Sequence, residues 1–187
     1  MWFTVPNLFT LLRVAMTPYI LLELARGRYL IAGWTFGAAA FTDLLDGFIA
    51  RRFDAQSRVG QYLDPVADKL LLSAIYVGLM LGHAVAPWVV AVVFGRDLWI
   101  LLLSGIALRF TKYRELRPGI WGKASTFVQV MTAVGIMAAR AYNYAPFAEI
   151  ADGLVWALVA LAVVSAADYT ARGIGFWQRS RNERVVL

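Results

Sequence analysis

Residues 41–70 read FTDLLDGFIARRFDAQSRVGQYLDPVADKL, and four aspartates interrupt the apolar flanks of this stretch: Asp43, Asp46, Asp64 and Asp68. A carboxylate at membrane depth costs roughly 2.5–3.5 kcal/mol on insertion scales, so this group requires a compensating charge. The first two are three residues apart and the last two are four apart, so on helices each pair shares one face. Two helices that meet along these faces would gather four carboxylates, whose oxygens suit hard divalent cations such as Mg²⁺.

The composition indicates an integral membrane protein built from α-helices. The chain has 187 residues, of which 60% are hydrophobic, and its mean hydropathy is +0.63. Apolar segments near the ~20 residues that a helix needs to cross a bilayer recur along the whole chain. We therefore predict an all-α, polytopic fold with six transmembrane helices, near residues 7–25, 29–50, 62–82, 85–108, 122–141 and 148–169.

The domain organisation is predicted to be simple. No linker or internal repeat divides the chain, which indicates one membrane domain over residues 1–187 with a short basic tail at 172–187. The N-terminal segment lacks a charged leader and a small-residue cleavage site, so we interpret it as mature sequence. The absence of cysteine excludes disulfides and thiolate sites.

The basic residues predict orientation and environment. With six spans, twelve Lys and Arg residues fall on the side of the 51–61 loop, the 109–123 loop and the C-terminal tail, against three on the other side. The positive-inside rule then places both termini in the cytoplasm, with the aspartates at the cytosolic face of the cytoplasmic membrane. The net charge of +6 indicates contact with anionic lipid, and nucleic-acid binding is the poorer interpretation because no basic run is interleaved with base-stacking aromatics.

The aspartates belong to a longer pattern, D-x2-D-G-x2-A-R-x8-G-x3-D-x3-D. All eight of its fixed positions are filled, by Asp43, Asp46, Gly47, Ala50, Arg51, Gly60, Asp64 and Asp68. This pattern resembles the motif of the CDP-alcohol phosphatidyltransferase family. The segment Pro6-Asn7-x-x-Thr10-x-x-Arg13 is similar to the opening of that family, so the resemblance covers nearly the whole chain.

The resemblance implies a set of site residues. Asp43, Asp46 and Asp64 would be metal ligands, and Asp68 would be a metal ligand or the general base. The metal would be Mg²⁺ or Mn²⁺, as two ions. The cytidine diphosphate pocket would be lined by Gly47, Ala50, Arg51 and Gly60, with Asn7 and Thr10 from the opening segment.

Physical chemistry supports these roles independently. Divalent cations on the carboxylates would reverse the local charge toward a pyrophosphate and polarise its oxygens. The guanidinium fork of Arg51 suits a phosphate, and the glycines Gly47 and Gly60 permit close approach of a ligand to the backbone. Asp68 lies deepest in its span of the four aspartates, which makes it the candidate base.

A second group of residues is predicted to contact the alcohol acceptor. Arg96 beside Asp97 interrupts the fourth span, and an intramembrane charge is a candidate functional residue. The segment GKASTFVQ at 122–129 is similar to a G-K-x-x-T-x-x-Q element of the family near the acceptor side. The predicted acceptor contacts are Arg96, Arg117, Lys123 and Thr126.

Several of these features have structural alternatives. Asp64 before Pro65 could be a helix N-cap, and Asp68 could form a structural ion pair with Lys69 or another cation. Arg96 and Asp97 could form a local neutralised pair. The spacings Gly33-x-x-x-Gly37 and Gly78-x-x-x-Gly82 allow either ordinary helix packing or the seam of a homodimer.

The reaction implied by the resemblance is transfer of a phosphatidyl group from CDP-diacylglycerol to an alcohol with release of CMP, in phospholipid biosynthesis. The first expectation for the acceptor is sn-glycerol 3-phosphate, as in a phosphatidylglycerol phosphate synthase. Asp97 stands where that type usually has a glutamate and Ser125 where it often has a lysine. Both departures favour the alternative, a cardiolipin synthase that uses phosphatidylglycerol. A divalent-cation transporter is the non-enzymatic alternative, although the aspartates do not continue across the bilayer.

Overall fold

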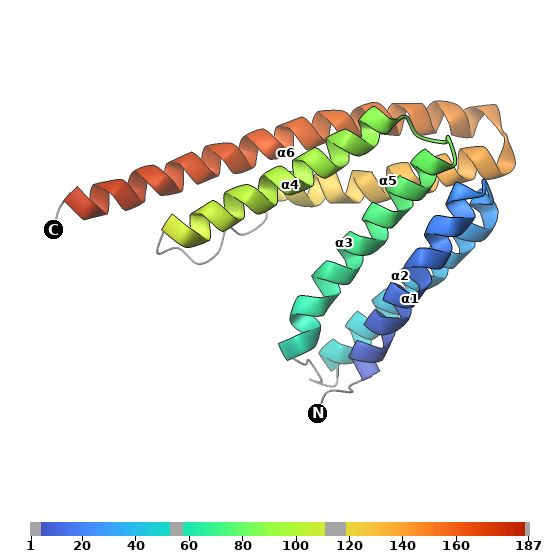
Figure 1. The fold of residues 1–187 in the computed structure, drawn as a ribbon, viewed down its shortest axis with the longest axis horizontal. Helices are drawn as coiled ribbons and strands as arrows, with labels where there is room; N and C mark the ends of the chain where they lie inside the picture. Colours follow the sequence, from blue (N-terminus) through green and yellow to red (C-terminus); the bar gives the residue numbers. More distant parts are fainter. Residues whose placement is uncertain (1–4, 53–57, 111–118, 186–187) are drawn as a thin grey trace. The chain divides into compact units, whose positions relative to one another are not determined.

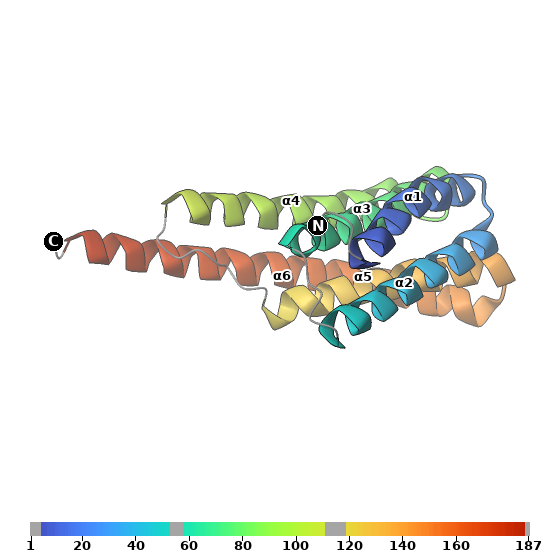
Figure 2. The same cartoon turned by 90° about the horizontal axis from the view of Figure 1, so that it is seen from below.

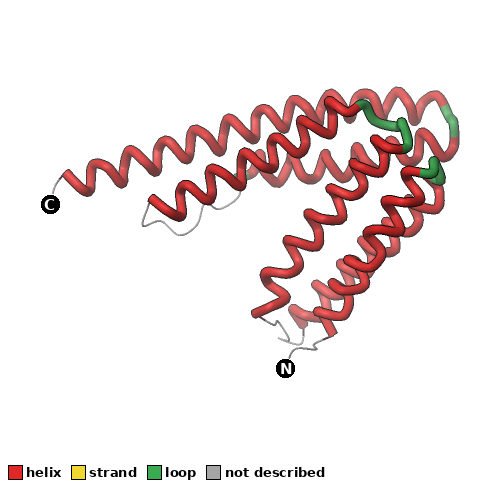
Figure 3. Tube along the Cα trace, viewed as in Figure 1, coloured by secondary structure: helices red, strands yellow, loops and turns green. Residues whose placement is uncertain are grey.

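The computed structural model describes residues 5–52, 58–110 and 119–185, and it describes side chains for residues 11–42, 66–106 and 119–175. Within these ranges the chain forms helices joined by short turns, and no strand is present in them (Figure 3). The all-α prediction is therefore confirmed.

Six helices lie in the described ranges. Their bounds are α1 Val5–Ala25, α2 Tyr29–Arg52, α3 Arg58–Leu81, α4 Pro87–Phe110, α5 Ile120–Tyr142 and α6 Ala145–Val185 (Figure 1). Each overlaps one of the six predicted segments, because apolar runs of this length are most stable as helices in which every backbone group is bonded internally.

Three stretches of the described residues are long and apolar enough to cross a membrane: Pro87–Ile106 in α4, Ile120–Tyr142 in α5 and Ala145–Gly175 in α6. They support assignment as a membrane protein. The structure thus supports the six predicted segments as helices. Three of these helices contain a described stretch that is both long enough and apolar enough to cross a membrane.

Helix α6 is longer than predicted. Its 41 residues span about 60 Å at 1.5 Å per residue, against ~30 Å for a hydrocarbon core. The segment after residue 171, which the sequence suggested was a tail, continues the helix as far as Val185.

Three turns between helices use left-handed backbone conformations. They centre on Gly27 (φ 73°), His83 (φ 56°) and Asn143 (φ 47°). At the first, the amide of Gly27 donates to the carbonyl of Leu24 at 3.0 Å and the amide of Arg28 donates to that of Glu23 at 2.8 Å. These bonds satisfy carbonyls that the end of α1 would otherwise leave unpaired.

The structure divides into two compact units. The first contains residues 1–86 and 133–149, and the second contains residues 87–132 and 150–187. In the first unit, α1 packs against both α2 and α3, and Figure 2 shows these three helices from below. Its core includes Ile20 and Leu24 of α1 with Ile75 and Leu79 of α3, all fully buried.

Two glycines let α3 approach the end of α1. A Cβ added at Gly78 would lie 2.8 Å from the Cβ of Leu24 and 3.0 Å from the carbonyl oxygen of Leu21. At Gly82 it would meet the carbonyl oxygen of Leu24 and the hydroxyl of Tyr29, which donates to the carbonyl of Gly82 at 2.6 Å. For this pair the packing alternative is confirmed, because both glycines serve contacts within the chain.

In the second unit, polar and aromatic contacts connect α4, α5 and α6. The indole nitrogen of Trp99 donates to the hydroxyl of Thr170 at 2.9 Å. The hydroxyl of Thr132 lies 3.2 Å from the carbonyl oxygen of Leu154. Trp88 and Trp156 pack with ring centroids 6.1 Å apart.

One structural alternative from the sequence is wrong. Helix α3 begins at Arg58, so Asp64 is not its N-cap, and Asp64 and Pro65 both lie within the helix. The predicted 51–61 loop is also shorter than expected, since α2 continues to Arg52 and α3 starts six residues later.

Replacing Gly78 by alanine should destabilise the protein. A helix gains about 1 kcal/mol from Gly→Ala in its interior, but forcing a methyl group into this contact costs about 1–3 kcal/mol. The matched control is Gly37→Ala, because a Cβ there meets nothing within 4 Å. Thermal unfolding in detergent should show a lower Tm for Gly78→Ala and an unchanged or higher Tm for Gly37→Ala. An equal Tm for the two variants would contradict the packing described here.

Candidate functional site

The motif residues are distributed over the first three helices, all in the first unit. Asn7 and Thr10 lie on α1. Asp43, Asp46, Gly47, Ala50 and Arg51 lie on α2. Gly60, Asp64 and Asp68 lie on α3. Among these, Asp68 is the residue whose side chain is described. The other nine residues lie outside the ranges whose side chains are described, so the site predicted from them stays a prediction.

Asp68 forms an ion pair with Arg13, in which Nη1 of Arg13 donates to Oδ1 of Asp68. Arg13 is 2% exposed on α1, whereas the Asp68 side chain is 54% exposed on α3. The buried cation thus meets a carboxylate that keeps half of its surface accessible. The hydroxyl of Thr17, one turn along α1, donates to the carbonyl oxygen of Arg13 at 2.8 Å.

The ion pair connects the two motifs that the sequence shows separately. Arg13 ends the opening pattern and Asp68 ends the aspartate pattern, 55 residues later. The sequence predictions did not include Arg13 among the site residues. A signal for it was present, because an arginine within an apolar segment requires an anionic partner once it is buried.

The residues present fit a divalent cation. The motif helices carry four carboxylates, and oxygen donors of this type are the ones that Mg²⁺ and Mn²⁺ prefer. The described member, Asp68, has exposed surface in addition to its bond with Arg13. Among the described side chains, which do not include Asp43, Asp46 and Asp64, no group of three His, Cys, Asp or Glu is placed to hold a metal ion.

Another buried carboxylate lies at the far end of α1. Glu23 is 2% exposed and accepts bonds from Arg26 at 3.2 Å and Arg28 at 3.5 Å. Both arginines are well exposed and flank the turn at Gly27. This group is therefore a structural feature of the α1–α2 turn and is separate from the aspartate motif.

The second unit contains a buried polar cluster around Arg96. Its guanidinium, 10% exposed, bonds Oδ1 of Asp97 at 3.0 Å, the hydroxyl of Ser165 at 2.8 Å and the carbonyl oxygen of Gly122 at 3.3 Å. Arg96 thus connects α4, α5 and α6. The pair with Asp97 that the sequence offered as an alternative is present, and the arginine has further polar contacts beyond it.

The other predicted acceptor residues lie at the start of α5, except Arg117, which lies outside the described residues. Thr126 is exposed and donates to the carbonyl oxygen of Gly122 at 3.2 Å, the same oxygen that Arg96 contacts. Lys123 is exposed beside it. The structure therefore brings Arg96 and Thr126 together at one carbonyl, whereas Ser125 is buried.

The sequence predictions missed a neighbouring ion pair on α6. Asp168 accepts a bond from Arg172 at 3.0 Å, and its Oδ2 is buried without a hydrogen-bond partner. A Cβ at Gly119 would lie 2.7 Å from Nη2 of Arg172 and 2.8 Å from that oxygen, so α5 begins in direct contact with this pair. The spacing of four between Asp168 and Arg172 was the available signal.

Comparison with known proteins identifies one family. The sequence profile described as CDP-alcohol phosphatidyltransferase matches residues 3–169, a range that includes the opening segment, all eight motif positions and the Arg96 cluster as far as Ser165. Members of this family generally depend on divalent metal ions.

Individual relatives carry two kinds of name. A probable cardiolipin synthase (CMP-forming) of Drosophila melanogaster is 32% identical over 88% of this chain and 55% of its own length. A probable phosphatidylglycerophosphate synthase of Mycobacterium tuberculosis is 31% identical over 90% of this chain and 80% of its own. A CDP-diacylglycerol–glycerol-3-phosphate 3-phosphatidyltransferase of Aquifex aeolicus is 30% identical over 90% of this chain and 95% of its own length. The chain thus spans about half the length of the fly protein and nearly all of the Aquifex protein.

The Arg13–Asp68 pair should show energetic coupling. In a double-mutant cycle with Arg13→Gln and Asp68→Asn, we expect a coupling energy of about 0.5–3 kcal/mol in the free energy of unfolding. The value should lie toward the lower end, because half of the Asp68 side chain is exposed. A cycle of Arg13→Gln with Asp152→Asn, in the other unit, should be additive. Additivity in both cycles would mean that the pair does not hold α1 to α3.

Arg96→Lys should lower stability although it keeps the charge. A single ammonium cannot reproduce the fork that reaches Asp97, Ser165 and the Gly122 carbonyl, so we expect a loss of about 1–3 kcal/mol. Arg140→Lys is the control, since Arg140 is exposed and makes one long bond, 3.4 Å, to the His83 carbonyl. Thermal unfolding should separate the two variants, and identical midpoints would contradict a bridging role for Arg96.

Proposed function

The chain belongs to the CDP-alcohol phosphatidyltransferase family, and on that basis we propose that it transfers a phosphatidyl group from CDP-diacylglycerol to an alcohol acceptor with release of CMP. The observation that carries the proposal is the family match over residues 3–169, which contains every fixed position of the aspartate motif. The Arg13–Asp68 pair supports it, because it ties the opening segment to the last motif aspartate.

We place the site at the cytosolic face of the cytoplasmic membrane. All six helices would cross the bilayer, with both termini in the cytoplasm, as the distribution of basic residues predicts. CDP-diacylglycerol would enter from the bilayer and the acceptor from the cytosol or from the same leaflet. A homodimer stays a prediction from the glycine spacings in the sequence.

The reaction is a displacement at the phosphorus that bears diacylglycerol. The acceptor hydroxyl oxygen forms the new bond to this phosphorus, and the bond from phosphorus to the oxygen of CMP breaks. The hydroxyl proton passes to the Asp68 carboxylate, which has the accessible surface that a base requires. Arg13 holds that carboxylate in position. Arg51 neutralises the departing phosphate, with Gly47, Ala50, Gly60, Asn7 and Thr10 lining the nucleotide pocket.

The four motif aspartates, Asp43, Asp46, Asp64 and Asp68, would hold two Mg²⁺ or Mn²⁺ ions. When bound, these ions supply charge neutralisation of the pyrophosphate and polarisation of its oxygens. The chain itself contributes positioning of the two substrates, which reduces the entropy cost of bringing them together.

Sn-glycerol 3-phosphate is the acceptor that we propose first. The names of the Mycobacterium and Aquifex relatives specify this reaction type, and cationic residues at Arg96, Arg117 and Lys123 suit a phosphorylated acceptor. Thr126 would add a hydroxyl contact. Phosphatidylglycerol is the second candidate. It is favoured by the fly relative and by Ser125, a buried neutral residue where the glycerol-phosphate type often has lysine.

CMP release by the purified protein tests the proposal. In detergent with CDP-diacylglycerol and Mg²⁺, we expect release on addition of glycerol 3-phosphate and loss of at least a hundredfold in Asp68→Asn, in keeping with the 10²–10⁴-fold contribution of a general base. Asp152→Asn, an exposed aspartate outside the motif, is the matched control and should retain activity.

The pattern of release identifies the acceptor. Release with phosphatidylglycerol alone would assign the cardiolipin synthase reaction. No release with either acceptor, together with metal uptake into vesicles that does not depend on CDP-lipid, would replace the enzyme proposal with the transporter. A melting temperature for Asp68→Asn near that of the parent protein would show that its lost activity is not lost folding.

A further inference from the structure

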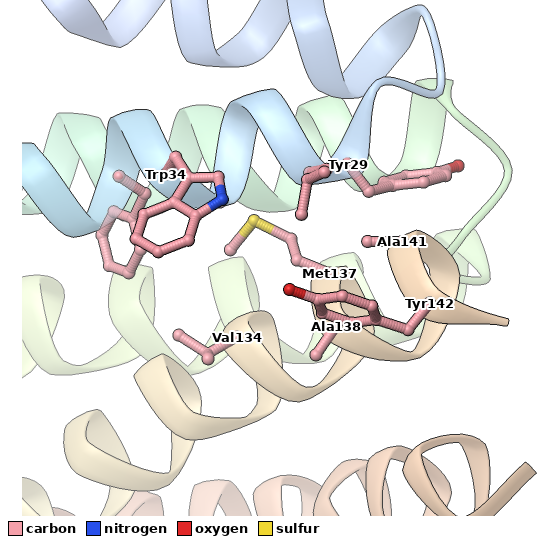
Figure 4. Close-up of a pocket in the computed structure, with 10 residues that line it drawn as sticks. Tyr29, Trp34, Val134, Met137, Ala138, Ala141 and Tyr142 are labelled. Atoms are coloured by element: carbon pink, nitrogen blue, oxygen red, sulfur yellow. The ribbon is translucent and has the colours of Figure 1, made fainter. Parts of the chain in front are cut away.

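The first unit contains an apolar pocket between α2 and the second half of α5, with a volume of about 190 Å³ (Figure 4). Its inner wall includes Phe36 and Met137, both buried, and its rim includes the exposed side chains of Leu30, Trp34 and Val134. None of the described residues that line it is charged. The pocket is smaller than the ~300–1,000 Å³ of sites that enclose a whole small ligand, so it fits part of a larger molecule.

The chemistry of the lining selects a hydrocarbon. The hydroxyl of Tyr29 is already bonded to the carbonyl of Gly82, at 2.6 Å, so it is satisfied within the protein. The rim residues are apolar and exposed, as expected for a surface that contacts lipid tails. Trp34 and Tyr142 also line the pocket, and both are well exposed. An acyl chain that packs against the buried inner wall can therefore leave the polar atoms of these two side chains uncovered.

The position of the pocket along α2 indicates which part of a lipid acyl chain it would bind. Gly33 lines the pocket, and Asp43 lies ten residues further along the same helix. At 1.5 Å per residue the two positions are about 15 Å apart along the axis, which is about half of the ~30 Å hydrocarbon core and so close to the length of one acyl chain. A lipid whose phosphates lie at the aspartate motif would have its chain terminus at this depth.

We propose that this pocket binds the terminal carbons of one acyl chain of the CDP-diacylglycerol donor and so sets a preference for chain length. The inference rests on the proposed function, because it takes the donor lipid to be anchored at the aspartate motif. Donors whose chains reach Gly33 gain the contact, and shorter donors do not.

Two small residues of α2 provide a matched test. A Cβ at Gly33 meets nothing within 4 Å, so a larger side chain fits there, and Gly33 lines the pocket. Ala38 is exposed, is not in the lining and lies about 140° around the helix from Gly33. Gly33→Phe therefore fills the cavity, whereas Ala38→Phe places the same side chain on another face of the helix.

The experiment compares CMP release from CDP-diacylglycerols with 16-carbon and 8-carbon chains. We expect the ratio of kcat/KM for the long donor to that for the short donor to fall roughly tenfold in Gly33→Phe, the effect of losing contact with about two methylene groups. Activity on the short donor should be retained, and Ala38→Phe should keep the ratio of the parent protein. Equal ratios in the two variants would overturn the proposal.

A binding measurement separates this inference from the proposed reaction. CDP-diacylglycerol with a photoreactive diazirine at the chain terminus should label peptides from residues 29–36 or 134–142, and Gly33→Phe should abolish the labelling. Excess unlabelled CDP-diacylglycerol should compete, and bulk phosphatidylcholine should not. Labelling elsewhere, or equal competition by the bulk lipid, would overturn the acyl-chain site. Absence of CMP release in the parent protein together with specific labelling would count against the reaction and leave the binding site supported.

Discussion

The ion pair between Arg13 and Asp68 is the interaction on which the first unit depends. A guanidinium that is 2% exposed inside a helical membrane protein requires an anion, and the carboxylate that meets it comes from α3. Because the pair joins α1 to α3, it fixes the register of the helix that carries Asp64 and Asp68. The close contacts at Gly78 and Gly82 fix the other end of the same two helices. Helix α3, which carries Asp64 and Asp68, is therefore anchored to α1 at two separated levels.

The second unit also contains a buried arginine, but it neutralises that charge in a different way. Here the intramembrane arginine, Arg96, meets the adjacent Asp97 and is completed by Ser165 and a backbone carbonyl. Charge neutralisation is local in sequence, and the long-range contacts are to neutral groups. A site built on Arg13 and Asp68 depends on the packing of two helices, whereas Arg96 keeps a counter-charge wherever α4 is placed.

The sequence predicted the helices well because each contains a long apolar run, and among the described residues the runs in α4, α5 and α6 are long and apolar enough to cross a bilayer. It predicted the ends less well: α2 and α3 extend into the expected 51–61 loop, and α6 continues to Val185. Charged residues near a helix end carry no signal that distinguishes a loop from one more helical turn. The motif aspartates were identified by spacing alone, whereas the partner of Asp68 could not be, since pairing across 55 residues depends on how two helices pack. Ser165 was missed for the same reason, whereas the local pair of Asp168 and Arg172 could have been found from its spacing of four.

The separation of Arg13 from Asp68 along the chain also sets a time interval during synthesis. At about 5–20 residues per second, the 55 residues between them take about 3–11 s to be made. During that interval α1 exists with its arginine but without the carboxylate of α3. An arginine at the centre of a helix costs roughly 2.5–3.5 kcal/mol on insertion. The arrival of α3 is therefore the event that gives Arg13 its counter-charge.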